Sequence, residues 1–381
     1  MASVMDEARA ITPVDVSDIA LYVEDRWREP FGRLRAEMPV SWCPESPYGG
    51  YWSVATHALV QAVELDPATF SSSWENGNIV IADPPPESNL PNFIAADPPV
   101  HTAQRKVIAP AFNPSQMAER EKTVKQRTRE LFDALPVGET FDWVESVSVP
   151  LTIGMLCILF DFPWEERHDL KRWSDYGGNV SPETASEEYR AQWMAEMGAM
   201  LARFDRELEA RKALPLIVGG NDTTRNSMSG LVEALHRFPG ELDRLRADPA
   251  LIPNAAQEII RWQSPVTHMR RTCMADTELG GQTIRRGEKV ILWYISANRD
   301  ESVFPQADLF DVGRDNARRH VAFGHGIHRC VGARLAEIQL CTLIEEIVAR
   351  GIRIEPQGAP ARLASPFLHG FVHMPVRIVA D

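Results

Sequence analysis

Ten residues near the C-terminus of this 381-residue chain carry more structural information than any other stretch, Phe323-Gly324-His325-Gly326-Ile327-His328-Arg329-Cys330-Val331-Gly332. Cys330 follows a glycine-rich loop and precedes a segment whose apolar residues recur at helical spacing. A thiolate at a helix N-terminus is stabilised by the helix dipole and by free backbone N–H groups. The glycines let the backbone or a flat ligand approach closely. The pattern therefore suits a cysteine that serves as an axial ligand of haem iron.

Two other interpretations of this stretch remain open from spacing alone. His320, His325, His328 and Cys330 could form a zinc site, although zinc usually takes two separated pairs of ligands and the sequence offers no second pair. Cys330 could also be a buried cysteine that caps the following helix.

The composition is that of a globular protein, with 44% hydrophobic and 24% charged residues. Its 28 prolines exceed the usual share, and the extra ones fall in short clusters such as 84–86, which favours one compact domain with many shaped loops. We therefore expect a single domain over residues 1–381. The five cysteines are odd in number and irregularly spaced, so a disulfide framework is not expected.

Charge and hydropathy restrict the function classes. The formal net charge is −13, which argues against a nucleic-acid partner. No run approaches the roughly 18 consecutive apolar residues of a membrane span. The N-terminal segment is rich in acidic residues, unlike a secretory signal or a basic transit peptide. We expect a cytoplasmic protein without a membrane span.

Hydrophobic periodicity predicts a mainly α-helical chain with a minor antiparallel β region. Helices are expected at 100–111, 115–135, 142–160, 164–176, 184–211, 215–237, 241–247, 253–262 and 331–350. Strands are expected at 51–54, 269–272, 278–284 and 288–295, with a β-like tail at 351–379. Residues 71–96 form a long loop with many apolar residues, which suggests a lid over an apolar site.

Two further motifs lie in the helical region. Glu258 and Arg261 are three residues apart, so they share a helix face and can form an ion pair. Residues 219–224 read Gly-Gly-Asn-Asp-Thr-Thr, and two glycines inside a helix cost about 2 kcal/mol relative to alanine. Thr223 can bond back to a carbonyl one turn earlier and open the helix there. A groove beside an acid and an alcohol suits the binding of O₂ and the relay of protons, although a plain polar kink would also fit.

Together these motifs resemble the cytochrome P-450 superfamily over nearly the whole chain. Its haem-ligand signature matches 323–332, its Glu-x-x-Arg motif matches 258–261, and its oxygen-activation motif matches 219–224. The resemblance implies a single P-450-like haem domain, haem b as cofactor with Cys330 as the ligand of its iron, and O₂-dependent monooxygenase activity.

The resemblance also implies roles for individual residues. Thr223 and Asp222 would be catalytic, Thr223 assisting oxygen activation and Asp222 carrying protons inward. The haem propionates would be held by His101, Arg105, Arg271 and His328. A buried structural triad would consist of Glu258, Arg261 and Arg314.

Within the superfamily, the chain resembles bacterial alkane and fatty-acid terminal hydroxylases. The segments that carry this resemblance are 25–31, 141–144, 219–228, 258–263 and 326–332. This implies hydroxylation of a medium-chain linear substrate at or near its end, with a [2Fe–2S] ferredoxin and a ferredoxin reductase as electron partners. The substrate pocket would come from 79–93, the helix before Gly219, 266–269 and 367–369. The alternatives are a terpenoid hydroxylase, an H₂O₂-dependent peroxygenase and a non-catalytic haem-binding sensor.

The chain departs from the family pattern near 211–216. Similar proteins carry a further segment between the helix ending near Lys212 and the helix that contains Gly219. At 1.5 Å per residue, the few residues present here give too little helix to cross above a haem, and we expect roughly thirty residues to be missing.

Overall fold

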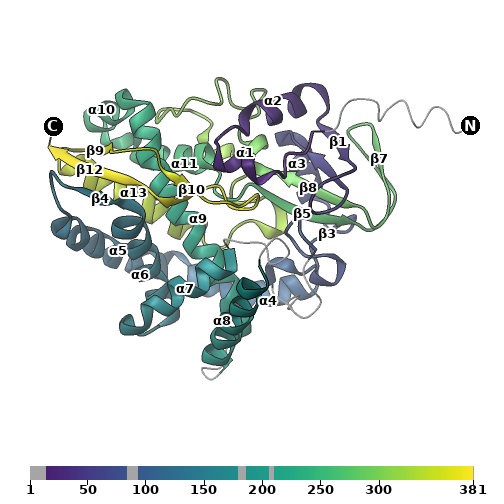
Figure 1. Ribbon diagram of the computed structural model, residues 1–381, viewed down its shortest axis with the longest axis horizontal. Helices are drawn as coiled ribbons and strands as arrows, with labels where there is room; N and C mark the ends of the chain where they lie inside the picture. The colour runs from purple at the N-terminus through teal and green to yellow at the C-terminus, as the bar shows by residue number, and fades with distance from the viewer. Residues whose placement is uncertain (1–13, 84–92, 179–185, 206–209, 381) are drawn as a thin grey trace, which may run out of the picture.

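The computed structural model describes residues 14–83, 93–178, 186–205 and 210–380; within its helices, the side chains of 201 and 204–219 are not described. Helices form most of the molecule (Figure 1). Their bounds are α1 Ile19–Val23, α2 Arg28–Glu37, α3 His57–Glu64, α4 Val100–Ile108, α5 Pro114–Ala134, α6 Val149–Phe160, α7 Arg167–Gly178, α8 Glu187–Asp205, α9 Ala210–Arg237, α10 Pro239–Ala247, α11 Ile252–Gln263, α12 Tyr294–Ala297 and α13 Ala333–Ala349.

The strands form one five-stranded sheet and three small ones. The bounds are β1 Val40–Cys43, β2 Tyr51–Val54, β3 Phe70–Ser71, β4 Thr140–Asp142, β5 His268–Cys273, β6 Thr277–Leu279, β7 Gln282–Ile284, β8 Lys289–Trp293, β9 Ile352–Pro356, β10 Ala361–Arg362, β11 Phe371–His373 and β12 Pro375–Ala380. The large sheet has the order β1-β2-β8-β5-β3 and lies with α1–α3 at one end of the molecule (Figure 1). The three-stranded sheet β4-β12-β9 and the two-stranded sheets β10-β11 and β6-β7 complete the β structure of the described residues.

Buried apolar side chains form separate hydrophobic cores. The largest core lies among α6, α7, α9, α11 and α13, with fully buried residues such as Leu156, Leu170, Met228, Ile259 and Leu343. A second core covers one face of the large sheet and includes Val54, Val60, Val290 and Leu292. All four residues of β2 are buried because helices or loops cover both faces of the sheet there.

Local signals place the elements that surround the site. Helix α11 ends where Ser264 adopts a left-handed conformation, φ 46°, directly before Pro265. A proline disfavours helical geometry in the residue before it, so the chain leaves the helix and enters β5. Helix α13 begins after Gly332 and buries its apolar face, as its spacing predicts.

The predicted fold class, mainly α with a minor antiparallel β region, is confirmed. Within the large sheet, however, β2 pairs with β8 in parallel. The predicted helix 142–160 begins instead with a π-helical turn, Val144–Ser148, before α6. Residues 212–214, which the sequence predicts to separate two helices, lie inside α9, as does Pro215. The centre of the predicted lid, 84–92, lies outside the described residues.

Candidate active site

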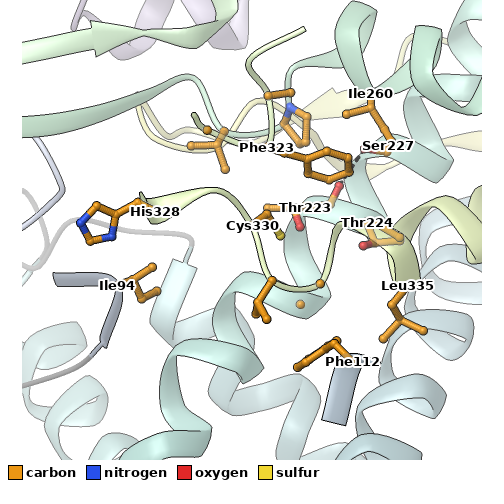
Figure 2. A pocket seen from close by; sticks show the side chains of 18 of the residues that line it. Ile94, Phe112, Thr223, Thr224, Ser227, Ile260, Phe323, His328, Cys330 and Leu335 are labelled. Atoms are coloured by element: carbon orange, nitrogen blue, oxygen red, sulfur yellow. Dashed lines mark hydrogen bonds between the residues drawn. The ribbon is translucent and has the colours of Figure 1, made fainter. Parts of the chain in front are cut away.

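A cavity of about 190 Å³ lies between α9, α13, β5 and the loop that carries Cys330. Its lining is mainly apolar and includes Ile79, Phe93, Ile94, Val266 and Met269. Figure 2 shows Cys330 and His328 on one loop, with Thr223, Thr224 and Ser227 on α9. The residues of the most informative sequence motif and those of the glycine-containing helix therefore meet at one cavity.

Cys330 lines the cavity, and its side chain is exposed there. Its backbone N–H donates to the carbonyl of Phe323 at 2.7 Å, which closes the loop. Burial raises the pKa of the Cys330 thiol, while the backbone N–H groups of Gly332 and Ala333 lower it. The helix N-terminus acts on the thiol as the sequence predicts, but desolvation is the larger effect, and binding to a metal cation would deprotonate the thiol outright.

Four ring nitrogens at the edge of this site have no hydrogen-bond partner among the residues that the structure describes. They belong to His101 of α4 and His328, whose rings lie 4.4 Å apart between centroids. Burial and neighbouring positive charges lower the pKa of His328 to about 2 and lower that of His101, so both rings are neutral in this arrangement. A buried ring without partners is costly, which indicates that a polar ligand belongs there.

Two arginines complete the polar edge of the cavity. Arg105 lies one helical turn after His101 and donates to the Arg329 carbonyl at 2.5 Å. Arg271 comes from β5 and pairs with the buried Glu64 at 3.1 Å. The structure thus brings together His101, Arg105, Arg271 and His328, the four predicted propionate holders.

This donor set fits haem b, the cofactor that the resemblance implies. Haem presents two carboxylates at one edge, and two cations with two partnerless imidazoles can receive them. The thiol of Cys330 lines the same cavity and would supply the iron ligand. The zinc alternative is not supported, because no group of three or more His, Cys, Asp or Glu side chains among the described residues could hold a metal ion.

Asp222 and Thr223 face different surroundings although they are adjacent. Thr223 lines the cavity, and Ser227 donates to its carbonyl at 2.9 Å. Asp222 is fully buried, is not among the lining residues, and pairs with Arg225 at 2.6 Å. Ser174 of α7 donates to its other oxygen at 3.2 Å. The sequence predicted both residues at the cavity, and the structure places only Thr223 there.

A chain of charges leads from Asp222 toward the surface. Arg225 also contacts Asp175 at 2.8 Å, and Asp175 contacts Lys171 at 2.9 Å. Desolvation raises the pKa of Asp222 to about 6, and the charge of Arg225 opposes that rise. Asp222 is therefore an acid that can change its protonation state near neutral pH.

Glu258, Arg261 and Arg314 form one buried cluster. Arg261 binds both oxygens of Glu258 at 2.7 Å, and Arg314 donates to Oε1 at 2.9 Å. Arg261 also donates to the carbonyls of Asn298, Ala307 and Leu309. The ion pair on one helix face, and its third partner, are where the sequence and the resemblance placed them.

The predicted substrate pocket is only partly reproduced. Ile79, Phe93, Val266 and Met269 line the cavity, whereas 367–369 are not among the lining residues. His369 is instead buried beside Gln263, whose backbone carbonyl lies 2.6 Å from its Nδ1. The side chains of the helix before Gly219 lie outside the described residues.

A contact that the sequence did not reveal fixes the segment that brings Ile79 to the cavity. Asp83 accepts from Arg270 of β5 at 2.5 Å and from Lys289 of β8 at 3.1 Å. Both cations are buried, while Asp83 is largely exposed. Lys289 also donates to the carbonyls of Tyr48 and Ile81. No short motif signals this contact, because Asp83 is 187 residues from Arg270 and 206 residues from Lys289.

His268 holds the same segment through a backbone contact. The Ile81 N–H donates to His268 Nε2 at 3.2 Å, while Nδ1 lies 3.1 Å from the Pro366 carbonyl. One tautomer, protonated on Nδ1, satisfies both contacts. Burial lowers the pKa of His268 to about 3, which keeps the ring neutral and Nε2 an acceptor.

Replacing Asp83 with asparagine is expected to loosen this cavity wall. An ion pair with one exposed partner contributes about 0.2–1 kcal/mol, so the dissociation constant of a linear-chain substrate should rise about two- to five-fold. Spectroscopic titration of the purified protein measures it. Replacement of the exposed Asp133, which pairs with Arg350 away from the cavity, serves as the control. Equal affinities in the Asp83→Asn variant and the wild type would contradict a role for this contact.

Comparison with known proteins agrees with this geometry. The family model described as Cytochrome P450 matches residues 243–362. The chain is 39% identical to linalool 8-monooxygenase of Pseudomonas putida over 407 aligned residues, which cover 96% of this chain and 98% of that protein. It is 32% identical over 411 residues to the methyl-branched lipid omega-hydroxylase of Mycobacterium tuberculosis (strain ATCC 25618 / H37Rv), covering 95% of each.

The fold is also similar to that of a solved structure, cytochrome P450-153 from Novosphingobium aromaticivorans. The TM-score is 0.91 at 47% sequence identity, over 96% of this chain and 99% of that chain. Among the described residues, no helix is long and apolar enough to cross a membrane. The match over nearly the full length of these relatives, together with a thiol and a polar edge that fit haem, shows that the chain belongs to the cytochrome P450 family and is a monooxygenase with haem b as its cofactor.

Proposed function

We propose that this protein hydroxylates a medium-chain linear alkane or fatty acid at or near its terminal carbon. The observation that carries the proposal is the apolar cavity wall formed by Ile79, Ile94, Val266 and Met269. Burial of each CH₂ group contributes about 0.8 kcal/mol, so such a wall can bind a chain along its length and orient its end. The likeness to a methyl-branched lipid omega-hydroxylase supports the same class.

Cys330 is proposed as the iron ligand. His101, Arg105, Arg271 and His328 are proposed to receive the haem propionates, and Glu258, Arg261 and Arg314 to hold the fold beneath the haem. When bound, the haem supplies the iron at which O₂ is activated. One oxygen atom enters the C–H bond of the substrate, and the other leaves as water after two electrons and two protons are taken up.

The protein's own residues are proposed to orient the substrate and deliver protons. The apolar wall excludes water and positions the chain end. Asp222 takes up protons from the side of Asp175 and Lys171, whose charges lead toward the surface, and releases them toward the wall to which Thr223 belongs. Arg225 stays charged and holds the Asp222 carboxylate. Thr223 presents its hydroxyl group where O₂ is activated.

The electron donor is proposed to be a reduced [2Fe–2S] ferredoxin served by a ferredoxin reductase, and the location is proposed to be the cytoplasm. Comparing turnover with these partners against turnover with H₂O₂ alone tests the donor. Activity with H₂O₂ only would indicate a peroxygenase, and no turnover with either would favour a haem-binding sensor.

The chain is further proposed to be one domain over residues 1–381 that lacks a segment near 211–216. The alignment with the Pseudomonas putida relative spans 407 positions, which exceeds the 381 residues of this chain, so that relative has positions without a counterpart here. A single cooperative unfolding transition of the haem-loaded protein tests the domain organisation.

The substrate class is tested by a spin-state titration of the ferric protein with a medium-chain alkane, a medium-chain fatty acid and a monoterpenol. Displacement of a water ligand by substrate shifts the haem toward high spin. A saturable shift with the linear chains, followed by a terminal alcohol as product, supports the proposal. A shift with the monoterpenol only would discard the linear-chain assignment.

A terpenoid substrate is the second candidate. It is favoured by the 39% identity to linalool 8-monooxygenase, whose name states an acyclic terpenoid alcohol as substrate. Both candidates place an apolar chain against the same cavity wall, so the head group distinguishes them in the titration.

Replacing Asp222 with asparagine is expected to slow product formation about 100-fold or more, since positioned proton donors contribute about 10²–10⁴-fold. The pKa of Asp222 is about 6, so its protonated fraction falls as pH rises through 6. In the wild type, turnover should therefore decline above about pH 6. The pH–rate profile of Asp222→Asn should lack this declining limb. Product formation measured across pH tests this, with the spin-state titration as the control for substrate binding.

Ser174→Ala provides a matched variant. The Ser174 hydroxyl lowers the pKa of Asp222, so its removal should move the declining limb to higher pH. A limb that stays in place in both variants would show that Asp222 does not supply the proton.

A further inference from the structure

Glu64 is a buried carboxylate at the end of α3, outside all of the motifs read from the sequence. It accepts hydrogen bonds from three separate elements. Arg271 of β5 donates to Oε1 at 3.1 Å, and the Tyr294 hydroxyl of α12 donates to the same oxygen. The backbone N–H of His325, on the loop before Cys330, donates to Oε2 at 3.1 Å.

The same residue packs directly against that loop. Gly326 has φ 62°, and a Cβ placed on it would lie 2.6 Å from the backbone oxygen of Glu64. Any side chain at Gly326 would therefore push α3 away from the loop. The end of α3 and the Cys330 loop form one packed unit, in which the Glu64 carboxylate lies beneath the loop.

Two of the three donors also line the cavity, namely Arg271 and Tyr294. The Glu64 side chain is fully buried and that of Arg271 nearly so, so water screens their charges weakly. The Glu64 carboxylate is thus the charge that balances Arg271 at the cavity edge. If it were lost, the guanidinium would retain acceptors such as the Arg270 carbonyl, at 2.7 Å, but would lose its carboxylate partner.

We propose that Glu64 is a positioning residue that holds Arg271 at the cavity edge, balances its charge and thereby keeps the reduction potential of the bound haem low. The inference rests on the proposed roles of Cys330 and Arg271. Outer hydrogen bonds and nearby charges tune the potential of a bound metal centre, and a negative charge close to it disfavours the reduced form. Glu64 provides such a charge without contacting the substrate.

The test is a redox titration of the substrate-free holoprotein with chemical mediators. Glu64→Gln is nearly isosteric; it removes the charge and replaces one accepting oxygen by an amide nitrogen, so the ferric/ferrous midpoint potential should become more positive. Glu64→Asp keeps the charge, so its potential should stay near that of the wild type. Asp25→Asn is the control, because Asp25 is a mostly buried carboxylate paired with arginines and is not among the cavity-lining residues.

Tyr294→Phe supplies a prediction of opposite sign. It removes one donor from the carboxylate and leaves the charge in place, so the carboxylate acts more strongly on the cavity. The midpoint potential should then become more negative. If the contact were merely structural, the midpoint potentials of Glu64→Gln and Tyr294→Phe would shift in the same direction, or neither would shift. If Glu64→Gln does not retain haem, Glu64→Asp and Tyr294→Phe still decide the question.

An unchanged potential in folded Glu64→Gln, or a positive shift in Tyr294→Phe, overturns the inference. The readout needs neither substrate nor electron partner, so it is separate from the test of the proposed function. If the wild type forms no terminal alcohol while the potentials shift as expected, the proposed substrate class fails and the inference stands. If terminal hydroxylation occurs and the potentials do not move, the inference fails and the proposed substrate class stands.

Discussion

Replacing Cys330 with serine is expected to abolish thiolate ligation and to reduce substrate hydroxylation more than about 100-fold, because even outer contacts at metal sites are worth about 10–100-fold. A neutral hydroxyl group is a much poorer ligand for iron than a thiolate, and it cannot push electron density toward O–O cleavage. The ferrous–carbon monoxide spectrum measures the ligand, and product formation measures the activity.

Cys341→Ser is the matched control for this experiment. Cys341 lies on α13, the helix that follows Cys330, but it is not among the cavity-lining residues. It should retain both the spectrum and the activity of the wild type. Hydroxylation that survives in Cys330→Ser would remove the central assignment of this site.

Replacing Glu258 with glutamine is expected to destabilise the holoprotein by about 3–5 kcal/mol, because Arg261 and Arg314 would both be left as buried charges without a counter-ion. Domains are stable by only about 5–15 kcal/mol, so a loss of this size is a large fraction of the protein's stability. Urea unfolding followed by tryptophan fluorescence measures the change, and haem content reports whether the loop before Cys330 still folds.

Glu119→Gln is the control with the same sequence spacing. Glu119 pairs with Lys122 at 2.9 Å, three residues away on a helix, but both side chains are exposed. Its loss should cost under about 1 kcal/mol. If the two variants unfold at the same urea concentration, the buried cluster does not support the fold in the way that its geometry suggests.

Short-range patterns predicted the frame of the molecule. The loop before Cys330, the helix after it and the pairing of Glu258 with Arg261 all depend on residues within about one or two turns of each other. At that distance, backbone geometry alone decides which side chains share a face. Short-range patterns are therefore enough to predict Cys330 as the cofactor ligand and to identify the family pattern without long-range information.

Helix boundaries near 205–217 and the direction of Asp222 were not predictable in this way. Adjacent residues on a helix point about 100° apart, so one can line a cavity while its neighbour turns away, as Thr223 and Asp222 do. Which of the two lines the cavity depends on how α9 packs against α7. Ser174 of α7 donates to Asp222, and Asp175 of α7 pairs with Arg225.

What the sequence by itself determined is the mainly helical fold class, the cysteine on its glycine-rich loop and the set of cations around it. Only the tertiary structure decided that Glu64 meets Arg271 across 207 positions and that Asp83 meets Arg270 and Lys289. These contacts join elements that no local spacing relates. They form because a buried charge without a partner is costly, so the fold is stabilised where packing brings opposite charges into contact.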